Sequence, residues 1–332
     1  MTDLLTIGEP MVVFASQNAE KSLANSTDFK KYLAGAEVNV AVGISRLGHS
    51  VQYITQLGRD PWGEYILAKL SRCKINTDYV SLSSTFPTGI MFKSLTHKGD
   101  PKTYYMRKNS AASKIIPENL KDISFTTIKR AHITGIFLAT SSQALDSIKY
   151  LIQKLNNLHI PITFDPNLRP DLWLNKENMI STLNEIAKYT NTILPGLVEG
   201  KILTRKNTPD EIAQFYFNQS TLTQTVIIKL GAKGAKIFTR DGFKKFIPGF
   251  PAKKVIDTVG AGDGFATGVI SGLLENLSLE DAVLRGNAIG SLAVQSPGDN
   301  TGYPSQKELQ EFMKGYNNVT RNSKDELFES TN

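Results

Sequence analysis

The chain has 332 residues, of which 40% are hydrophobic and 21% charged, and its formal net charge is +7. A single cysteine excludes an internal disulfide framework, and neither a metal-ligand spacing of histidines nor a signal-peptide or membrane-spanning run is present. We therefore expect a cytoplasmic protein that does not bind membranes. Because Lys and Arg are dispersed along the chain, we also expect that it does not bind nucleic acid.

The chain is long enough for one large or two modest domains. Along it, short apolar runs alternate with helix-length amphipathic stretches. The clearest runs, bounded by Gly, Pro or Asp, are residues 4–8, 132–136, 162–165 and 226–230. This alternation predicts an α/β fold with a parallel sheet covered by helices on both faces. Between about residues 88 and 107, two strand-like segments flank Lys98–Pro101 and predict a hairpin that leaves the main layer.

No repeat or long linker divides the chain. We therefore expect one α/β domain over residues 1–315, with a small lid formed from about 9–17 and 86–110. Residues 316–332 are polar and are expected to form a C-terminal tail.

In chain order, the first candidate site is the run of small and polar residues from Ala34 to Ala41. Gly35 and Asn39 stand at an expected helix start, where an asparagine most often caps the helix or faces solvent. Asn39 therefore has two interpretations, a structural residue or a ligand-binding residue, which this segment alone does not separate.

Two arginines, Arg107 and Arg169, are candidates for binding an anion. A guanidinium group is planar and permanently charged, so it can hold a carboxylate with paired hydrogen bonds, and Tyr105 offers a further donor. The alternative is that each arginine is a solvated surface residue. Together they favour an acidic small molecule over a neutral hexose as the substrate.

Lys229 ends the apolar run 226–230 and is followed by Gly231, Ala232 and Gly234. This stretch is too short for a P-loop, and its simplest interpretation is a hairpin turn into residues 235–238.

The most informative segment is Asp257-Thr258-Val259-Gly260-Ala261-Gly262-Asp263. Two glycines permit a tight turn into a helix, so that the N–H groups of Gly260, Ala261 and Gly262 converge on an oxyanion. A helix N-terminus keeps the Asp263 carboxylate ionised, ready to accept a proton from an attacking hydroxyl. The alternative is a glycine-rich helix start whose aspartate only stabilises the helix dipole.

This seven-residue string resembles the signature of the ribokinase-like carbohydrate kinases, also called the PfkB family, and the resemblance runs from Leu4 to about Phe312. It implies a three-layer α/β/α sandwich with a mainly parallel central sheet and a small β-strand lid. It also implies transfer of the γ-phosphate of ATP to a sugar hydroxyl, with Mg²⁺ as a cofactor and Asp263 as the catalytic base. Activation by a monovalent cation occurs in the family, and lids of this kind commonly pair between subunits, so we expect a homo-oligomer.

The resemblance assigns further residues to the two ligands. The implied sugar-binding segment is Gly35, Ala36, Glu37, Val38 and Asn39. The implied nucleotide contacts are Asn167, Arg169, Lys229, Gly231, Ala232, Gly234, Gly260, Gly262 and Asn287.

Three segments resemble the branch of this family that phosphorylates 2-keto-3-deoxygluconate, namely residues 104–113, 164–169 and 194–200. This resemblance implies transfer to the terminal hydroxyl, giving 2-keto-3-deoxy-6-phosphogluconate. It also places Tyr105, Arg107 and Arg169 at the sugar acid, while Arg169 has the transferred phosphoryl group as an alternative partner.

The chain departs from the family pattern at two positions. Met91 stands where related kinases have a sugar-contacting tyrosine, and Gly196 stands where many have an asparagine near the metal-bound phosphates. Only Glu199 remains of that second motif, so we expect Mg²⁺ to be held mainly by ATP, with Glu199 acting through water. An equally simple role for Glu199 is that of a carboxylate opening a helix.

Three other functions stay open at this point. The chain could be a fructokinase or a kinase for another deoxy sugar acid, because hydroxyl recognition is hard to derive from spacing. It could be a non-catalytic sugar sensor on the same fold, although the intact Asp263 argues against this. A dinucleotide-dependent dehydrogenase is disfavoured, because no Gly-x-Gly-x-x-Gly follows the first strand.

Overall fold

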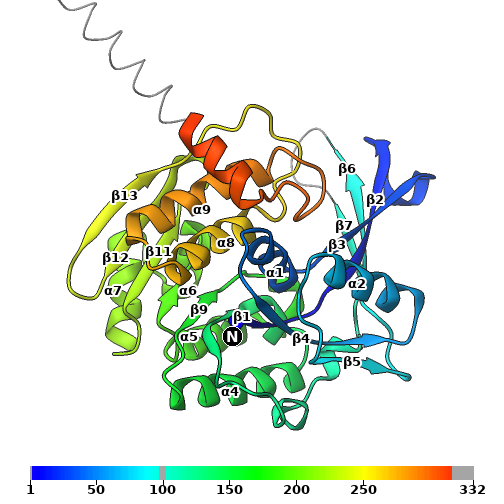
Figure 1. Ribbon diagram of the computed structural model, residues 1–332, viewed down its shortest axis with the longest axis horizontal. Helices are drawn as coiled ribbons and strands as arrows, with labels where there is room; N and C mark the ends of the chain where they lie inside the picture. Colours follow the sequence, from blue (N-terminus) through cyan, green and yellow to red (C-terminus); the bar gives the residue numbers. More distant parts are fainter. Residues whose placement is uncertain (1, 97–101, 316–332) are drawn as a thin grey trace, which may run out of the picture.

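The computed structural model describes residues 2–96 and 102–315. The tail expected at 316–332 and the turn expected at Lys98–Pro101 lie outside the described residues. The described chain has the α/β architecture that the sequence predicts, with one large sheet between two layers of helices and a second, smaller sheet beside it (Figure 1).

The large sheet has nine strands. Their spatial order is β13 (Lys244–Pro248), β12 (Gly234–Thr239), β11 (Thr225–Lys229), β10 (Thr192–Ile193), β9 (Ile162–Asp165), β8 (Ile128–Thr134), β1 (Thr2–Ile7), β4 (Val51–Gly58) and β5 (Val80–Ser83). Neighbours from β11 to β5 pair in parallel, whereas β11, β12 and β13 form an antiparallel meander. The four apolar runs read from the sequence are confirmed as β1, β8, β9 and β11, and the turn after Lys229 leads into β12 as expected.

Helices cover both faces of this sheet (Figure 1). One layer contains α1 (Ala36–Arg46), α2 (Pro61–Arg72), α8 (Ala261–Leu274) and α9 (Leu279–Ala293). The other contains α3 (Gly135–Leu138), α4 (Ser142–Asn157), α5 (Lys176–Ala187), α6 (Leu197–Thr204) and α7 (Pro209–Gln219). Successive strand residues point to opposite layers: Leu4 packs in the core beneath α1 and α8, while Leu5 packs in the core beneath α4.

The second sheet contains strands from both segments that were expected to form a lid, and it is called the lid below. Its strands are, in order, β3 (Phe29–Ala34), β2 (Met11–Ala19), β6 (Ile90–Leu95) and β7 (Thr103–Met106). β6 and β7 pair antiparallel, as predicted for the hairpin. Strand β3 is not anticipated by the sequence, because its first residues, Phe29, Lys30 and Lys31, are exposed and give no alternation of buried and exposed side chains.

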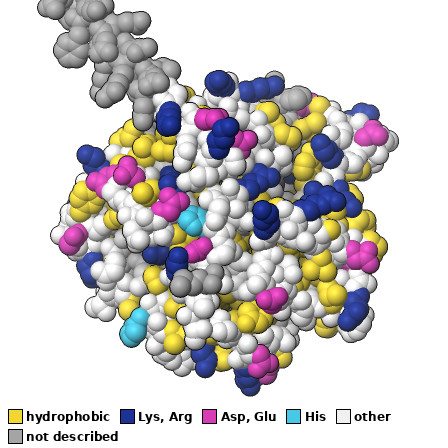
Figure 2. All heavy atoms as spheres, in the orientation of Figure 1, with side chains coloured by type: hydrophobic (Ala, Val, Ile, Leu, Met, Phe, Trp, Pro, Cys, Tyr) yellow, Lys and Arg dark blue, Asp and Glu magenta, His cyan; other side chains and the backbone are white. Residues whose placement is uncertain are grey.

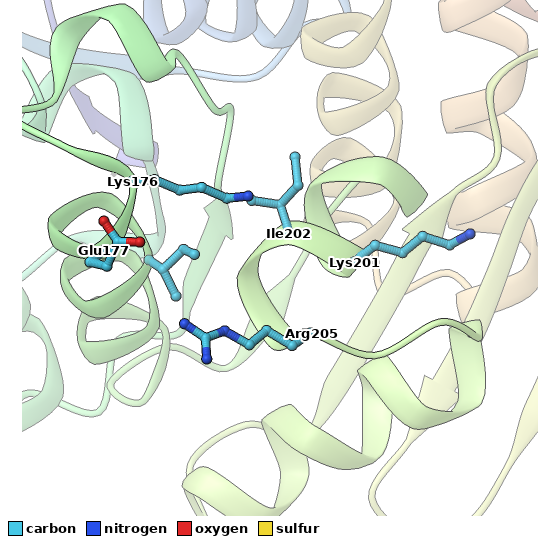
Figure 3. A pocket seen from close by; sticks show the side chains of 6 residues that line it. Lys176, Glu177, Lys201, Ile202 and Arg205 are labelled. Atoms are coloured by element: carbon cyan, nitrogen blue, oxygen red, sulfur yellow. The ribbon is translucent and has the colours of Figure 1, made fainter.

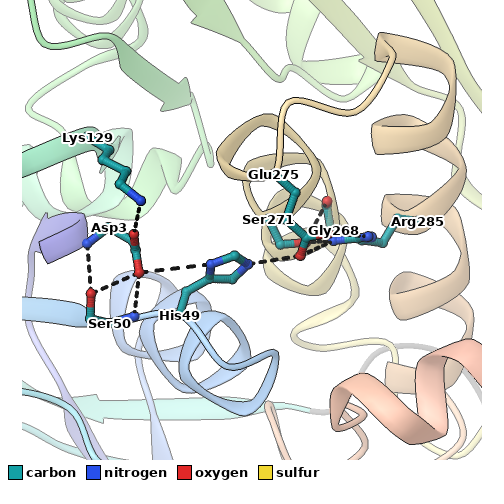
Figure 4. A network of polar contacts seen from close by, with 8 residues as sticks. All are labelled: Asp3, His49, Ser50, Lys129, Gly268, Ser271, Glu275 and Arg285. Carbon is teal, nitrogen blue, oxygen red and sulfur yellow. Dashed lines mark hydrogen bonds and ion pairs between the residues drawn. The ribbon is translucent and has the colours of Figure 1, made fainter. Parts of the chain in front are cut away.

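A polar network fixes the far end of α8 (Figure 4). His49 lies between two carboxylates, with Nε2 at 3.1 Å from Glu275 Oε1 and Nδ1 at 4.0 Å from Asp3 Oδ2. Arg285 of α9 holds Glu275 with two hydrogen bonds of 2.8 Å, and Lys129 lies 2.7 Å from Asp3. The network therefore ties the C-terminal end of α8 to α9 and to the start of β1.

The described surface carries no continuous basic band on the face shown in Figure 2, where Lys and Arg are scattered among acidic and uncharged side chains. Within residues 2–96 and 102–315, every helix is too short or too polar to cross a bilayer.

Candidate active site

The carboxyl ends of the parallel strands lie together at one edge of the large sheet. Ile7, Thr134, Asp165 and Lys229 end their strands at this edge, and the segments that follow Asp165 and Lys229 carry five residues predicted to bind ligands: Asn167, Arg169, Gly231, Ala232 and Gly234. Ligands of open α/β sheets bind at this edge, because the loops that leave parallel strands converge there.

Asp263 lies at this edge, in the first turn of α8. Asn39 Nδ2 donates a hydrogen bond to Asp263 Oδ2 at 2.8 Å, and Asn167 Nδ2 donates one to Oδ1 at 3.3 Å. Burial raises the pKa of Asp263 to about 7; the Asn39 hydrogen bond opposes this rise and the nearby Asp165 adds to it. The sequence predicts an ordinary ionised aspartate here, so the structure corrects that expectation: desolvation outweighs the helix N-terminus.

The turn before Asp263 has the geometry of an anion site. Gly260 caps α8 with φ = 84°, and a side chain at this position would collide with the carbonyl oxygen of Asp299. Tyr303 donates a hydrogen bond of 2.6 Å from its hydroxyl to Gly260 O. The first N–H groups of a helix have no partner within it, so those that follow Gly260 can bind an oxyanion.

The predicted sugar segment begins at Gly35, which precedes α1 with φ = 133°. The side chains of Glu37 and Val38 are buried in the interior. Glu37 accepts a hydrogen bond from the Thr134 hydroxyl, and burial raises the pKa of Glu37 to about 7. Ala36 and Asn39 are buried as well, and the Asn39 side chain makes the hydrogen bond to Asp263.

Asn39 is held at both ends of its amide. Its Oδ1 accepts a hydrogen bond of 2.7 Å from Asn300 Nδ2, while its Nδ2 donates to Asp263. This arrangement orients Asp263, and the binding of a ligand by Asn39 stays a prediction. Asn300 and Tyr303 were missed at that stage, because both lie beyond α9 in a loop without a recognisable motif.

The two predicted arginines differ in availability. Arg107 is 8% exposed, and it donates from Nε to Glu9 Oε2 at 2.8 Å and also from a terminal nitrogen. Arg169 is exposed, and it lies near enough to Asp263 and Asp299 to oppose the rise in the pKa of each. Arg169 is therefore the arginine more open to an incoming anion.

Glu9 was missed by the sequence analysis, although a charged residue directly after a buried strand is a detectable signal. Its Oε1 is buried and has no hydrogen-bond partner in the described part of the chain. Tyr105 lies close to the same ion pair: its ring centre is 5.7 Å from the Arg107 guanidinium carbon, and its side chain is 40% exposed. Substrate groups that reach this corner would therefore meet Tyr105 and the Arg107–Glu9 pair together.

A second pair of charged groups lies where β9 and β11 end. Lys229 Nζ is 2.6 Å from Asp165 Oδ2, and the N–H of Asn167 donates to Asp165 Oδ1 at 3.1 Å. Burial raises the pKa of Asp165 despite the adjacent lysine. Asn167 Oδ1 is buried without a partner among residues 2–96 and 102–315 and is available to a ligand.

Glu199 has the helix-opening role that the sequence left as an alternative. Its Oε2 accepts the N–H of Gly196 at 2.7 Å, and its Oε1 accepts the N–H of Leu168 at 2.8 Å. Both carboxylate oxygens are thus engaged by main-chain N–H groups. In the described residues, no group of three or more His, Cys, Asp or Glu side chains could hold a metal ion.

A cavity of about 390 Å³ opens beside the Gly260 turn. It brings together most of the predicted nucleotide contacts: Lys229, Gly231, Ala232, Gly234, Gly262 and Asn287. Ala261, which was predicted in the catalytic turn, also lines it. Its other wall is apolar and includes Phe250, Pro251, Val255 and Val294, which no sequence motif had indicated. Asn287 donates to the carbonyl oxygens of Ile247 and Pro248 at 3.1 and 3.0 Å. An apolar slot with an anion site at one end suits a planar base joined to phosphates.

A separate hollow of about 280 Å³ lies between α5 and α6 (Figure 3). Its charged lining side chains, from Lys176, Glu177, Lys201 and Arg205, are exposed, and it contains none of the predicted site residues. It therefore does not belong to the candidate active site.

The fold and this site have relatives among known proteins. The model of the pfkB family carbohydrate kinases matches residues 1–306. A 2-dehydro-3-deoxygluconokinase of Bacillus subtilis (strain 168) is 41% identical over 320 residues, which cover 96% of this chain and 97% of that protein. The crystal structure of a PfkB protein from Polaromonas sp. JS666 is 37% identical, with a TM-score of 0.86 over 93% of this chain and 99% of that one.

The chain belongs to the PfkB family of carbohydrate kinases, as the Asp257–Asp263 string indicates. Its fold is the ribokinase-like fold. An E. coli protein assigned as ribokinase II, solved in complex with ATP and Mg²⁺, has the same fold, with a TM-score of 0.86 at 24% identity over 95% of this chain and 99% of that one.

The raised pKa of Asp263 is testable without any substrate. In protein labelled with ¹³C at aspartate carboxyls, we expect Asp263 to titrate near pH 7, with its signal assigned by loss in Asp263→Asn. Asn39→Leu removes a hydrogen bond that favours the charged form, so the pKa should rise further. Asn218→Leu, at an exposed position of α7, should leave the pKa of Asp263 unchanged. A wild-type pKa near the ordinary value of about 4 would contradict this description of the site.

Proposed function

We propose that this enzyme transfers the γ-phosphate of ATP to the terminal hydroxyl of 2-keto-3-deoxy-D-gluconate, also called 2-dehydro-3-deoxygluconate, to give 2-keto-3-deoxy-6-phosphogluconate. The observation that carries the chemistry is the Asp263 carboxylate, held by Asn39 from one side and Asn167 from the other at the start of α8. The substrate is supported by the 41% identity to the Bacillus subtilis kinase along nearly the whole length of both chains.

In the proposed reaction, the terminal hydroxyl oxygen attacks the γ-phosphorus while its proton passes to an Asp263 carboxylate oxygen. A new oxygen–phosphorus bond forms, the bond from the γ-phosphorus to the β–γ bridging oxygen breaks, and ADP leaves. The N–H groups of Gly260, Ala261 and Gly262 stabilise the charge on the moving phosphoryl group. The site thus supplies position and charge rather than a covalent intermediate.

Nucleotide binding is proposed at the 390 Å³ cavity, with the base against its apolar wall and the phosphates toward Lys229 and the Gly260 turn. Mg²⁺ would neutralise charge on the phosphates. Most of its ligands would come from ATP, since the described residues lack a metal-binding cluster. Two oxygen donors that suit Mg²⁺ are nevertheless proposed to contribute: the unpaired Oδ1 of Asn167 and, through water, the Glu199 carboxylate.

The acid group of the substrate is proposed to bind Arg169, with Tyr105 and Arg107 at the lid side. Two arginines and a phenol match a carboxylate beside a keto group better than a neutral hexose, which has no anionic group for the exposed Arg169 guanidinium to bind. Met91, which replaces the usual tyrosine, is 4% exposed and packs with Val13 and Ala34 inside the lid. It therefore contributes shape rather than a hydrogen bond.

Residues 1–315 are proposed to form a single kinase domain that assembles through its lid. The outer strand β7 exposes Tyr104 and Met106 by 62% and 55%, and its free edge offers main-chain groups to another strand. A homo-oligomer paired through this edge would cover those side chains. The use of ATP supports the expectation of a cytoplasmic enzyme.

The choice of substrate is tested by a coupled ADP-release assay. We expect kcat/KM for 2-keto-3-deoxygluconate to exceed that for fructose, ribose, gluconate and 5-dehydro-2-deoxygluconate by at least about 100-fold. Gluconate keeps the carboxylate but lacks the keto group, so it separates acid recognition from recognition of the whole sugar. A higher kcat/KM for any of the other four compounds would replace the proposed substrate.

Replacing the base tests the chemistry. Asp263→Asn keeps the shape and one acceptor oxygen for Asn39 or Asn167 but cannot accept the proton, so kcat should fall by about 10²- to 10⁴-fold. ADP affinity, measured by calorimetry, should change by less than about threefold, because Asp263 does not line the nucleotide cavity. Asp146→Asn, on the exposed face of α4, is the matched control. Near-normal turnover in Asp263→Asn would remove Asp263 from the base role.

A further inference from the structure

Lys93 is a buried lysine with no part in the reaction described so far. It belongs to lid strand β6 and is 5% exposed. Its Nζ lies 2.5 Å from Asp257 Oδ2 and 3.6 Å from Asp299 Oδ1. Both carboxylates belong to loops of the large α/β unit, so this ion cluster joins the lid to the body of the enzyme.

The two carboxylates hold the turn that leads into α8. Asp257 Oδ1 accepts the N–H of Val259 at 3.1 Å, while its other oxygen accepts from Lys93. The main chain of Asp299 packs directly against Gly260, where it leaves no room for a side chain. Lys93 therefore contacts Asp257, which precedes the anion-binding turn in the chain, and Asp299, which packs against that turn.

We propose that Lys93 is a positioning residue for phosphoryl transfer, a lid-borne ammonium group that fixes the Gly260 turn by holding Asp257 and Asp299. The inference rests on the proposed kinase function. Without the ammonium group, two neighbouring carboxylates are left buried with no lysine between them, so one must gain a proton or both must move apart. Either response displaces the turn, and a displacement of about 1 Å can cost about 100-fold in rate.

The charges around the cluster support this role. Burial raises the pKa of Asp299 to about 6, Lys93 opposes that rise, and Asp257 adds to it. Arg169 lies near Asp299 as well, but it is exposed and is also the arginine assigned to the substrate. Lys93 is thus the permanent counter-ion of this pair, whereas Arg169 stays available to ligands.

The position of Lys93 also couples the lid to the turn. Because the ammonium group comes from β6, the turn has its described geometry only while that strand is docked. A cavity of about 620 Å³ lies at this junction, lined by Lys93 and other lid residues and by residues 254–258 and 297–299. A small cation that enters this cavity can therefore reach the site vacated by a truncated Lys93.

This access gives a test that separates charge from folding. In the full-length enzyme, Lys93→Ala should lower kcat by about 100-fold while KM for ATP changes by less than about threefold. Added ethylammonium should restore at least about tenfold of the lost kcat, because it supplies the missing charge. Hydrogen exchange at Val259–Gly262 should be faster in Lys93→Ala and should slow again when ethylammonium is added.

Lys102→Ala is the matched control, since Lys102 belongs to the same hairpin and its side chain is exposed. It should behave as wild type in each measurement. A kcat for Lys93→Ala within about threefold of wild type would overturn the proposal, and so would a loss of kcat that ethylammonium does not reverse, which would mark Lys93 as a purely structural residue. All variants are measured with the best acceptor of the wild-type enzyme, so a different substrate preference contradicts the proposed function without affecting this comparison.

Discussion

The candidate active site depends on one buried carboxylate held between two amides. Asp263 accepts hydrogen bonds from Asn39 and Asn167, which come from segments 224 and 96 residues away in the chain. Three separate parts of the fold must therefore be in register before Asp263 has its described position. The network around His49 at the other end of α8 serves the same geometry, because it fixes the helix that carries Asp263.

Burial gives this carboxylate its chemical character. A carboxylate in water has a pKa near 4 and is a weak base, whereas desolvation raises the pKa of Asp263 to about 7 and makes it a better proton acceptor. The surrounding charges are balanced in pairs, with Lys229 on Asp165, Arg107 on Glu9 and Lys93 on Asp257. Each pair is costly to break, by roughly 3–5 kcal/mol when one partner of a buried pair is removed. Pairing thus holds several charged side chains in fixed positions around the candidate site.

The sequence was sufficient for the parts of the molecule that local patterns encode. Buried strands such as β1 and β11 have continuous apolar runs, and the turn at Gly260 requires glycine for its backbone conformation, so both can be recognised from the sequence alone. Strand β3 was not predictable, because its exposed lysines hide the alternation. The partners Asn300 and Tyr303 were missed for a different reason: each makes a contact distant in sequence, and no local sequence pattern marks such a contact.

The side-chain roles show the same division between local and tertiary information. The sequence identified polar segments that could bind a ligand, but packing sets the direction of each side chain in them. Glu37 and Val38 point inward, and Glu199 caps α6. The pKa of Asp263 likewise follows from burial, which the helix-start pattern alone did not reveal.

The central claim, that a desolvated Asp263 is the proton acceptor, is tested most directly by the pH dependence of kcat/KM in the wild-type enzyme. Only the deprotonated carboxylate can act, so kcat/KM should be constant above about pH 8 and should fall about tenfold per unit below the pKa of about 7. A profile that stays flat down to about pH 5 would show that the group accepting the proton is an ordinary acid or that no such group limits the rate, and would contradict the account.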